Sequence, residues 1–513
     1  MVVLEQLAGF FGNVALLAMN PMNLFVLFGA VIMGIIFGAI PGLTSTLGVA
    51  LLTTLTFGMT LEMALLALLG VYVGGTYGAS YSAILLNIPG SAAAAATAFD
   101  GYPLALKGKG GETLGLATTA SAIGTFIGML FVVSMAPAIA RLALRFTSVE
   151  FFLLALFGII ISGTLTSEDL AYKGWIAGLL GILLALVGRD PLQSYPRFTF
   201  GIAGLGAGIE VVPVLIGAFG IPQIIQVLKD RYEPVKSVTI QRIVPGFGTM
   251  LRNAKYIVRS SLIGVGIGAV PGIGEDIAGW VSYGVAKNSS PHPEEYGKGS
   301  QEAVICTETA NNSCIGGAMI PLLSLGIPGS PPSAVLLGAL LLHGVNPGPM
   351  LRIDRPEFIL QVTAIMLLAS FAMWIAGMLL AKQVVKVLRI PPMSFMPIIG
   401  ALMVIGSYAL NAKVFNLYLM LPVGIVAYFL TEMKYPIAPL VIGVILGGMA
   451  DESLRRALMV SGGSFMPFVT RPVALVLLTV TILAILSQFQ SWKSVTRSLK
   501  RRLSNRFLKR DDT

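Results

Sequence analysis

The chain has 513 residues, of which 55% are hydrophobic and only 11% charged, and its mean hydropathy is +0.84. Soluble domains carry about 25% charged residues, so this composition excludes a soluble globular protein and indicates an all-α polytopic membrane protein. The formal net charge of +10 does not indicate nucleic-acid binding, because the basic residues gather in two short segments beside apolar spans.

Uncharged apolar runs recur along the chain and, at about 20 residues per span, predict roughly ten to fourteen membrane segments. The basic segments fall in the cytoplasm by the positive-inside rule. The N-terminal region carries Glu5 and no basic stretch, which favours a first helix that serves as its own insertion signal. We predict a first membrane repeat at 1–228, a basic connecting loop at 229–259, a second repeat at 260–470, a C-terminal membrane helix at 471–492 and a basic tail at 493–513.

The two halves of the chain echo each other. The segment 34–42, with Gly34, Gly38 and Pro41-Gly42, matches 264–272, which lies 230 positions later. Asn-Ile-Pro-Gly-Ser at 87–91 matches Gly-Ile-Pro-Gly-Ser at 326–330, which lies 239 positions later. Interrupted apolar segments at matched positions point to a transporter binding site near the bilayer midplane. We predict two structural repeats with Pro-Gly-broken re-entrant hairpins whose breaks share one site. The repeats are parallel or inverted depending on whether each half has an even or odd number of crossings, and we favour inverted repeats, in which the hairpins face each other from opposite leaflets.

The glycines spaced by four residues have a simpler interpretation. Such spacings let helices pack closely, and we expect this role at Gly34/Gly38, Gly70/Gly74/Gly78, Gly124/Gly128 and Gly264/Gly268.

The breaks themselves carry the chemistry. A proline within a helix frees the carbonyl four residues earlier, and here these carbonyls belong to Phe37, Leu85, Ile267 and Ser324. Freed carbonyls suit a hard cation such as sodium, whereas the amides of a restarting helix suit an anion. The neighbouring side chains are neutral: Thr44, Ser45, Thr46, Asn87, Ser91, Asn311, Asn312, Ser313, Ser324 and Ser330.

No Arg or Lys lies in either matched break. A bound carboxylate must then be held by backbone amides, hydroxyls and a co-bound cation. Sodium coupling follows as a hypothesis, with protons carried by Glu308 or Asp276 as the alternative. We expect no cofactor other than this coupling ion.

The remaining ionisable residues leave alternatives open. Glu308 lies at membrane depth, which favours a pairing or coupling role. Asp276 either caps a restarting helix or ligates the cation, and Asp100 opens an Asp-Gly turn, which favours a structural cap. His343 is either a proton relay or a packing residue. Cys306 and Cys314 have neither disulfide nor zinc spacing and are expected in the core.

Four segments resemble a known family: Tyr77 to Ser91, Phe99 to Ala105, Val270 to Ala278, and Glu308 through Leu325 and Ser330 to Pro349. They are similar to the TctA family, the large membrane subunit of bacterial tripartite tricarboxylate transporters, and the resemblance spans roughly Asn20 to Pro472. It implies a cation-coupled carboxylate importer in the bacterial inner membrane. It also implies two partners, a small membrane subunit of about four helices and a periplasmic solute-binding protein.

The resemblance also implies site residues. Those facing substrate and ions would be Asn87, Pro89, Gly90, Ser91, Asn311, Asn312, Gly326, Pro328, Gly329 and Ser330, supported by the breaks at Pro41-Gly42 and Pro271-Gly272. With the chemistry above, the expected ion site comprises Ser45, Thr46, Leu85, Ser324, Asp276 and Glu308. Ala303 and Ser313-Cys314 depart from the family pattern, and one extra hydroxyl in a dry site changes selectivity.

Three other functions compete with a carrier. A channel would favour a ring of repeated pore residues, and a scaffold subunit would bind partners without transporting. An intramembrane aspartyl protease is the third, since Gly272-Ile-Gly-Glu275 approaches its Gly-x-Gly-Asp loop. That chemistry needs a pair of aspartates, and Glu275 stands where one would belong.

Overall fold

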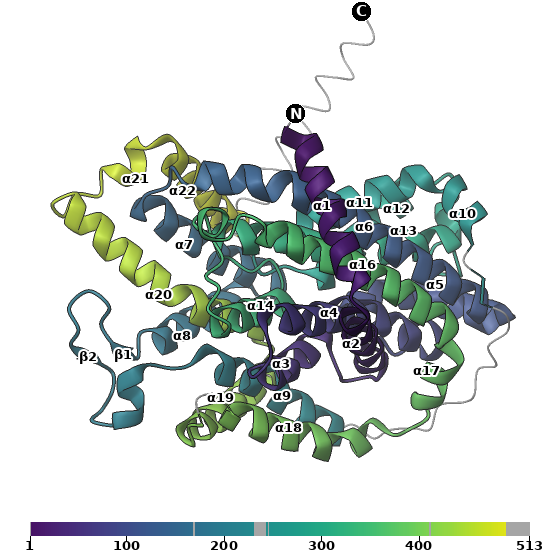
Figure 1. Cartoon of the computed structure of the whole chain (residues 1–513), viewed down its shortest axis with the longest axis horizontal. Coiled ribbons are helices and arrows are strands. Elements are labelled where there is room, and N and C mark those ends of the chain that lie inside the picture. Colours follow the sequence, from purple (N-terminus) through teal and green to yellow (C-terminus); the bar gives the residue numbers. More distant parts are fainter. Residues whose placement is uncertain (1, 168–169, 230–242, 245, 410–411, 489–513) are drawn as a thin grey trace, which may run out of the picture. The chain divides into compact units, whose positions relative to one another are not determined.

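The computed structural model describes residues 2–167, 170–229, 243–244, 246–409 and 412–488. The chain divides into two compact units, of which unit 1 comprises 1–145 with 209–433 and unit 2 comprises 146–208 with 434–513. Among the described residues, nine helices are long and apolar enough to cross a membrane. The expected all-α polytopic membrane fold is therefore confirmed (Figure 1).

The regular elements of unit 1, among its described residues, are all helical. Its α-helices are α1 Val2–Met19, α2 Pro21–Ala39, α3 Ser45–Leu55, α4 Leu61–Leu86, α5 Ala95–Leu104, α6 Gly110–Ala143, α9 Val211–Lys229, α10 Phe247–Arg252, α11 Ala254–Gly268, α12 Glu275–Ser289, α13 Gln301–Leu325, α14 Pro331–Leu342, α15 Leu351–Asp354, α16 Phe358–Leu379, α17 Ala381–Val387, α18 Met396–Ala409 and α19 Phe415–Glu432. Short helical turns are η1 Ala92–Ala94, η2 Ala105–Lys109, η4 Pro293–Glu295 and η5 Pro392–Phe395.

Unit 2 adds α7 Ser148–Thr166, α8 Ala171–Ala185, α20 Ile437–Val460, α21 Pro467–Thr470, α22 Pro472–Leu486 and the turn η3 Ala203–Ala207. Helix α20 packs along α7 and α8, and α22 packs on α7 (Figure 1). Between α8 and η3 a two-stranded antiparallel ribbon pairs β1 Gly188–Arg189 with β2 Pro196–Arg197.

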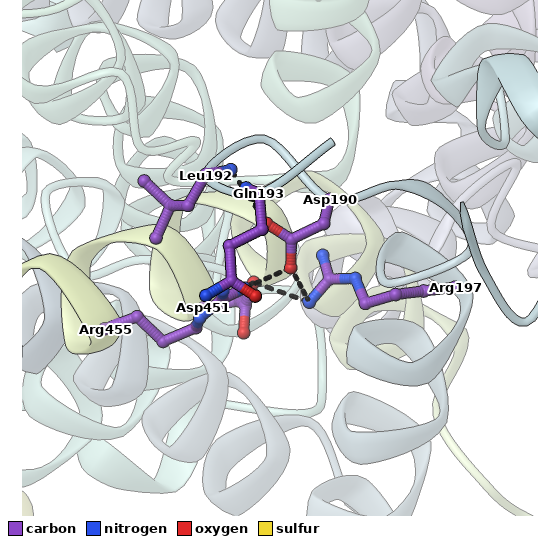
Figure 2. Close-up of polar contacts among 6 residues, drawn as sticks. All are labelled: Asp190, Leu192, Gln193, Arg197, Asp451 and Arg455. Atoms are coloured by element: carbon purple, nitrogen blue, oxygen red, sulfur yellow. Dashed lines mark hydrogen bonds and ion pairs between the residues drawn. The ribbon is translucent and has the colours of Figure 1, made fainter. Parts of the chain in front are cut away.

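The ribbon is fixed to α20 by an ion network around the buried Asp190 (Figure 2). Asp190 accepts hydrogen bonds from the backbone amides of Leu192 and Gln193, both at 2.8 Å, and pairs with Arg455. Arg197 bridges Asp190 and Asp451 at 3.5 and 2.9 Å. Hydrogen bonding to the Arg455 guanidinium is the main cause that lowers the pKa of Asp190 to about 2.

In the first broken hairpin of unit 1, a polar side chain caps the N-terminus of each helix. Asn20, Thr44 and Thr60 cap α2, α3 and α4. A Cβ on Gly34 would meet the Val71 carbonyl and a Cβ on Gly38 that of Gly75, so α2 and α4 run parallel. Because they run parallel, α3 must return between them, and α2–α3 is a helical hairpin with Pro41-Gly42 at its tip.

The second half repeats this arrangement contact for contact. A Cβ on Gly264 would meet the Ala310 carbonyl, and one on Gly268 would meet that of Cys314. Each of these partners lies 239 positions after its first-half counterpart. The glycines thus pack backbone against backbone as expected, and α11–α12 is the second helical hairpin.

The tips after α4 and α13 are equivalent as well. Asn87 and Gly326 both adopt left-handed backbone, with φ of 57° and 73°. A Cβ on Gly90 would lie 2.0 Å from the Gly38 carbonyl oxygen, and one on Gly329 would lie 2.1 Å from that of Gly268. Only glycine fits where the backbones approach this closely.

The repeats are inverted, as predicted. Ser80 of α4 contacts Glu308 of α13, whereas Tyr72, two turns earlier, contacts Ser330 beyond the end of α13, so α4 and α13 run antiparallel. The helices that follow each broken pair, α6 and α16, also run antiparallel. Thr119 contacts Trp374 and Ala122 contacts Ser370.

The repeat extends further than the Pro-Gly breaks indicate. Pro213-Val-Leu-Ile-Gly217 of α9 matches Pro439-Leu-Val-Ile-Gly443 of α20. In unit 1 a Cβ on Gly217 would meet α19, and in unit 2 a Cβ on Gly443 would meet α8. Helices α9 and α19 therefore form in unit 1 the kind of pair that α8 and α20 form in unit 2.

The predicted segment boundaries stay predictions. Each compact unit draws on both sequence halves. Within 229–259, α9 ends at Lys229, α10 spans Phe247–Arg252 and α11 begins at Ala254, while residues 230–242 and 245 lie outside the described residues. The tail at 493–513 also lies outside them, and α22 occupies Pro472–Leu486 of the expected C-terminal helix.

Candidate functional site

A cavity of about 670 Å³ lies against both breaks of the first half. Its lining comprises Pro41, Gly42, Thr44, Ile88, Pro89, Gly90, Ser91, Ala92, Gln223, Gln226, Val227, Pro392 and Met393. These residues come from the α2–α3 tip, the turn after α4, the end of α9 and η5. The lining contains no charged side chain, and its polar groups are hydroxyls, amides and the backbone of two broken helices.

The equivalent tip of the second half is closed. Ile327, Pro328, Gly329 and Ser330 are buried, and the Gly272 amide donates to the Pro328 carbonyl at 3.2 Å. The difference is clearest at the isoleucines 239 positions apart, since Ile88 is 46% exposed and Ile327 is 0% exposed. The two tips therefore occur in different states in one structure, one open and one closed.

Tyr72 of α4 joins the two halves at the closed tip. Its hydroxyl donates to Glu275 Oε1, at the start of α12, and lies 2.7 Å from Ser330 Oγ. Since a phenol has one hydrogen, Ser330 Oγ donates to Tyr72 Oη. The same Ser330 Oγ accepts from the Ser333 amide at 3.4 Å as the N-cap of α14. One side chain of the first half thus reaches the starts of two second-half helices.

Glu308 lies in a cage of hydroxyls. Ser80 and Thr97 donate to its Oε1 at 2.7 and 2.6 Å, and Ser121 donates to its Oε2 at 2.8 Å. The glutamate is 0% exposed, and the three donors come from α4, α5 and α6. Glu308 therefore ties three helices to α13.

The two predicted asparagines lie beside this cage and are buried. Asn311 Nδ2 donates to the Ala93 carbonyl at 3.3 Å. This hydrogen bond connects α13 to the first-half tip. Asn312 Nδ2 donates to the Glu308 carbonyl and to Asn311 Oδ1. Asn312 Oδ1 is buried without a hydrogen-bond partner in the structure. A buried unpaired acceptor costs about 1–3 kcal/mol, which fits a residue that pairs with a ligand.

The predicted ion ligands are spread over several places. Ser45 and Thr46 lie in the first turn of α3, at the repeat positions of Glu275 and Asp276. The amide of Ile88 donates to the Ser82 carbonyl. The amides of Gly326 and Ile327 donate to the carbonyls of Leu322 and Pro321. These turn hydrogen bonds do not use the carbonyls of Leu85 and Ser324. The expected free carbonyl at Ile267 is wrong, because the Val270 amide donates to it at 3.0 Å.

Asp276 and Asp100 have clear neighbours. Asp276 accepts from the Ala93 backbone of the first half. Asp100 accepts from the amides of Gly299 and Ser300 at 2.8 and 2.7 Å, from the Gly297 amide and from the Tyr283 hydroxyl. The predicted Asp-Gly turn is wrong, because Asp100 and Gly101 lie within α5. The role of Asp100 is structural, since its carboxylate holds the backbone of the segment that leads into α13.

The structure brings several predicted residues together and separates others. Pro89, Gly90 and Ser91 line the open cavity, whereas Ser330 lies at the closed tip and does not line it. The shared chamber stays a prediction. Both cysteines are free and buried, as expected. His343 caps the end of α14, and its relay role stays a prediction.

Sequence reasoning missed Tyr72, Gln223 and Gln226. The repeat could have identified Tyr72, because Tyr72 lies 239 positions before the predicted site residue Asn311. Each of these two side chains hydrogen-bonds to the tip of the other half. The Pro-Val-Leu-Ile-Gly match at 213–217 would have drawn attention to α9, which carries both glutamines.

Two inverted broken hairpins, one of which borders an uncharged cavity among apolar helices, define a multi-pass membrane protein of the transporter class. The family model "Tripartite tricarboxylate transporter TctA family" matches residues 24–442, and the chain belongs to this family. The expectation drawn from its motifs is confirmed.

Two relatives from Agrobacterium vitis are similar to the chain. An "Uncharacterized 52.8 kDa protein in TAR-I ttuC' 3'region" is 35% identical over 482 residues, which cover 92% of this chain and 95% of the relative. An "Uncharacterized protein in TAR-II ttuC' 3'region" is 37% identical over 229 residues, which cover 44% of this chain and 95% of the relative. No solved structure matches the chain.

Proposed function

We propose that this chain is the transporting subunit of a tripartite carboxylate importer, coupled to a cation gradient, with sodium as the coupling ion. The observation that carries the proposal is the cavity of about 670 Å³, which two broken helices and neutral polar side chains line. Its size suits a small polycarboxylate. Backbone amides at Gly90 and Ser91, with the Thr44, Gln223 and Gln226 side chains, supply neutral donors for carboxylate oxygens.

The coupling ion follows from the charge balance of the site. A carboxylate that enters a lining without Lys or Arg needs a compensating cation, because an unpaired charge in a dry site is expensive. Carbonyls at the breaks and hydroxyls such as Ser45 and Thr46 are hard oxygen ligands, which suit sodium. Glu308 and Asp276 provide the negative charge that would hold either sodium or a proton.

The distribution of basic residues supports an orientation. The cavity lies at the end of α9, which terminates in Lys229, and beside η5, which follows Lys382, Lys386 and Arg389. Short basic segments next to membrane helices face the cytoplasm. We infer that the open cavity faces the cytoplasm and that the closed second-half tip faces the periplasm of a bacterial inner membrane.

A carrier accounts for the asymmetry of the tips better than a channel does. A channel holds a continuous path open. Here Ile327 and Ser330 of the second-half tip are buried, so a path through both tips is blocked. The partners proposed for the chain are a small membrane subunit of about four helices and a periplasmic solute-binding protein that delivers the carboxylate.

Transport with substituted site residues tests the proposal. Asn312→Ala combined with Ser330→Ala should abolish uptake of labelled di- and tricarboxylates in cells that express the complete system, while complex assembly stays intact. Gly284→Ala is the matched control, because a Cβ at Gly284 meets nothing within 4 Å. Normal uptake by the double variant would refute a role of Asn312 and Ser330 in transport, and normal uptake by Ser91→Ala combined with Gln223→Ala would refute the cavity as the site. Sodium-independent uptake by the parent would refute the coupling ion.

A further inference from the structure

Several side chains cross between the halves, and two of them, Tyr72 and Asn311, stand at equivalent positions of the inverted repeat but differ in their contacts. Tyr72 reaches the second-half tip through Glu275 and Ser330. Asn311, which lies 239 positions later, reaches the first-half tip through a single bond of 3.3 Å to the Ala93 carbonyl. The tip with the two-partner crossing is closed, and the tip with the weak crossing borders the open cavity.

We propose that Tyr72 is a positioning residue that latches the second-half tip closed, and that its hydroxyl must leave Glu275 and Ser330 before that tip opens. Both partners stand at helix starts, Glu275 in the first turn of α12 and Ser330 at the N-cap of α14. A Cβ on Gly274 would lie 2.7 Å from Ser330 Cβ, so these starts are packed against each other. Release of Tyr72 therefore removes a first-half contact from both helix starts at once.

The chemistry of the latch is asymmetric between the repeats. Ser45 stands in the first half at the position of Glu275, and Asn311 stands in the second half at the position of Tyr72. The Tyr72 hydroxyl has two hydrogen-bond partners at the second-half tip, whereas Asn311 makes one bond of 3.3 Å to the first-half tip. The second-half latch therefore holds more firmly than its counterpart, which accounts for the closed state of this tip.

That opening of the second-half tip serves transport rests on the proposed function; that Tyr72 holds the tip closed does not. Thiol accessibility tests it without substrate or uptake. In a Cys306→Ala, Cys314→Ala background, a cysteine is placed at Ile327 or, as the matched control, at its repeat counterpart Ile88. The rate of labelling by a small maleimide is then measured on the purified full chain in detergent.

The expected result is slow labelling of Ile327→Cys and rapid labelling of Ile88→Cys, because the side chains are 0% and 46% exposed. Addition of Tyr72→Phe should accelerate labelling at 327 about tenfold, since the loss of two buried hydrogen bonds shifts an equilibrium by about that factor. Labelling at 88 should not rise. Tyr77→Phe removes another buried hydroxyl of α4, which bonds to Thr118, and should leave labelling at 327 unchanged.

Glu275→Gln is the second test. It keeps the size of the side chain at 275 and leaves Tyr72 in place, and it weakens the hydrogen bond between the two residues. It should accelerate labelling at 327 by a smaller factor than Tyr72→Phe. Labelling at 327 that neither substitution changes, or that Tyr77→Phe raises equally, would overturn the latch. A chain that passes this test but carries no carboxylate would instead contradict the proposed function.

Discussion

The substitution Gly90→Ala gives the sharpest mechanical test of the broken tips. The added Cβ would lie 2.0 Å from the Gly38 carbonyl oxygen, and Gly329→Ala would place one 2.1 Å from that of Gly268. Carbon and carbonyl oxygen approach to about 3.3 Å at closest, so either tip must move by more than about 1 Å. Overpacking of this kind costs about 1–3 kcal/mol, which corresponds to a change of about 5–150-fold in an equilibrium.

The assay is carboxylate uptake, with thermal unfolding of the purified chain measured in parallel. Both variants should lower the initial uptake rate at least about fivefold and lower the unfolding temperature, because the two contacts are equivalent. Gly284→Ala, with open space around the new Cβ, should match the parent in both measurements. Parent-like uptake and stability in Gly90→Ala would show that the tip does not pack as described, and would refute the reasoning.

Three further predictions follow from buried polar groups. Asp100→Ala leaves the Gly297, Gly299 and Ser300 amides without their acceptor and should lower the free energy of unfolding by about 3 kcal/mol; denaturant unfolding checks this, and a loss below about 1 kcal/mol would contradict the cap. Asp190→Asn should lower the unfolding temperature at pH 7. The lowered pKa of Asp190 contributes stability that is present above about pH 4 and is lost as the pH falls through about 2, so the difference should vanish there in a pH series; a difference independent of pH would contradict the network. Glu308→Gln should abolish uptake with normal expression, because three hydroxyls lose a charged acceptor; a parent-like sodium and pH dependence of uptake would exclude Glu308 from coupling.

The repeat could be predicted from the sequence because prolines and glycines in apolar helices have few uses. Pro41-Gly42 and Pro271-Gly272 are the tips of helical hairpins, and the glycines at 34, 38, 264 and 268 pack backbone against backbone. These features depend on local backbone chemistry, whereas the inversion of the repeats depends on the number of crossings per half, which the interrupted apolar runs leave open.

The site was less accessible because it depends on contacts between distant segments. Nothing local to Tyr72 shows that it faces Glu275 and Ser330, which lie 203 and 258 positions away. Likewise Gln223 reaches the cavity only because α9 packs beside the first-half tip. The open and closed states of equivalent tips could not be read from near-identical motifs at all.

Uptake by the complete system in proteoliposomes tests the central claim most directly. The chain, its small membrane subunit and its solute-binding protein are reconstituted, and a panel of labelled di- and tricarboxylates is offered with an inward sodium gradient or with choline in its place. The account predicts saturable, sodium-dependent accumulation of at least one carboxylate, which Ser91→Ala combined with Gln223→Ala weakens at the cavity. Accumulation of none of them above protein-free vesicles, or equal uptake in choline without any gradient, would contradict it.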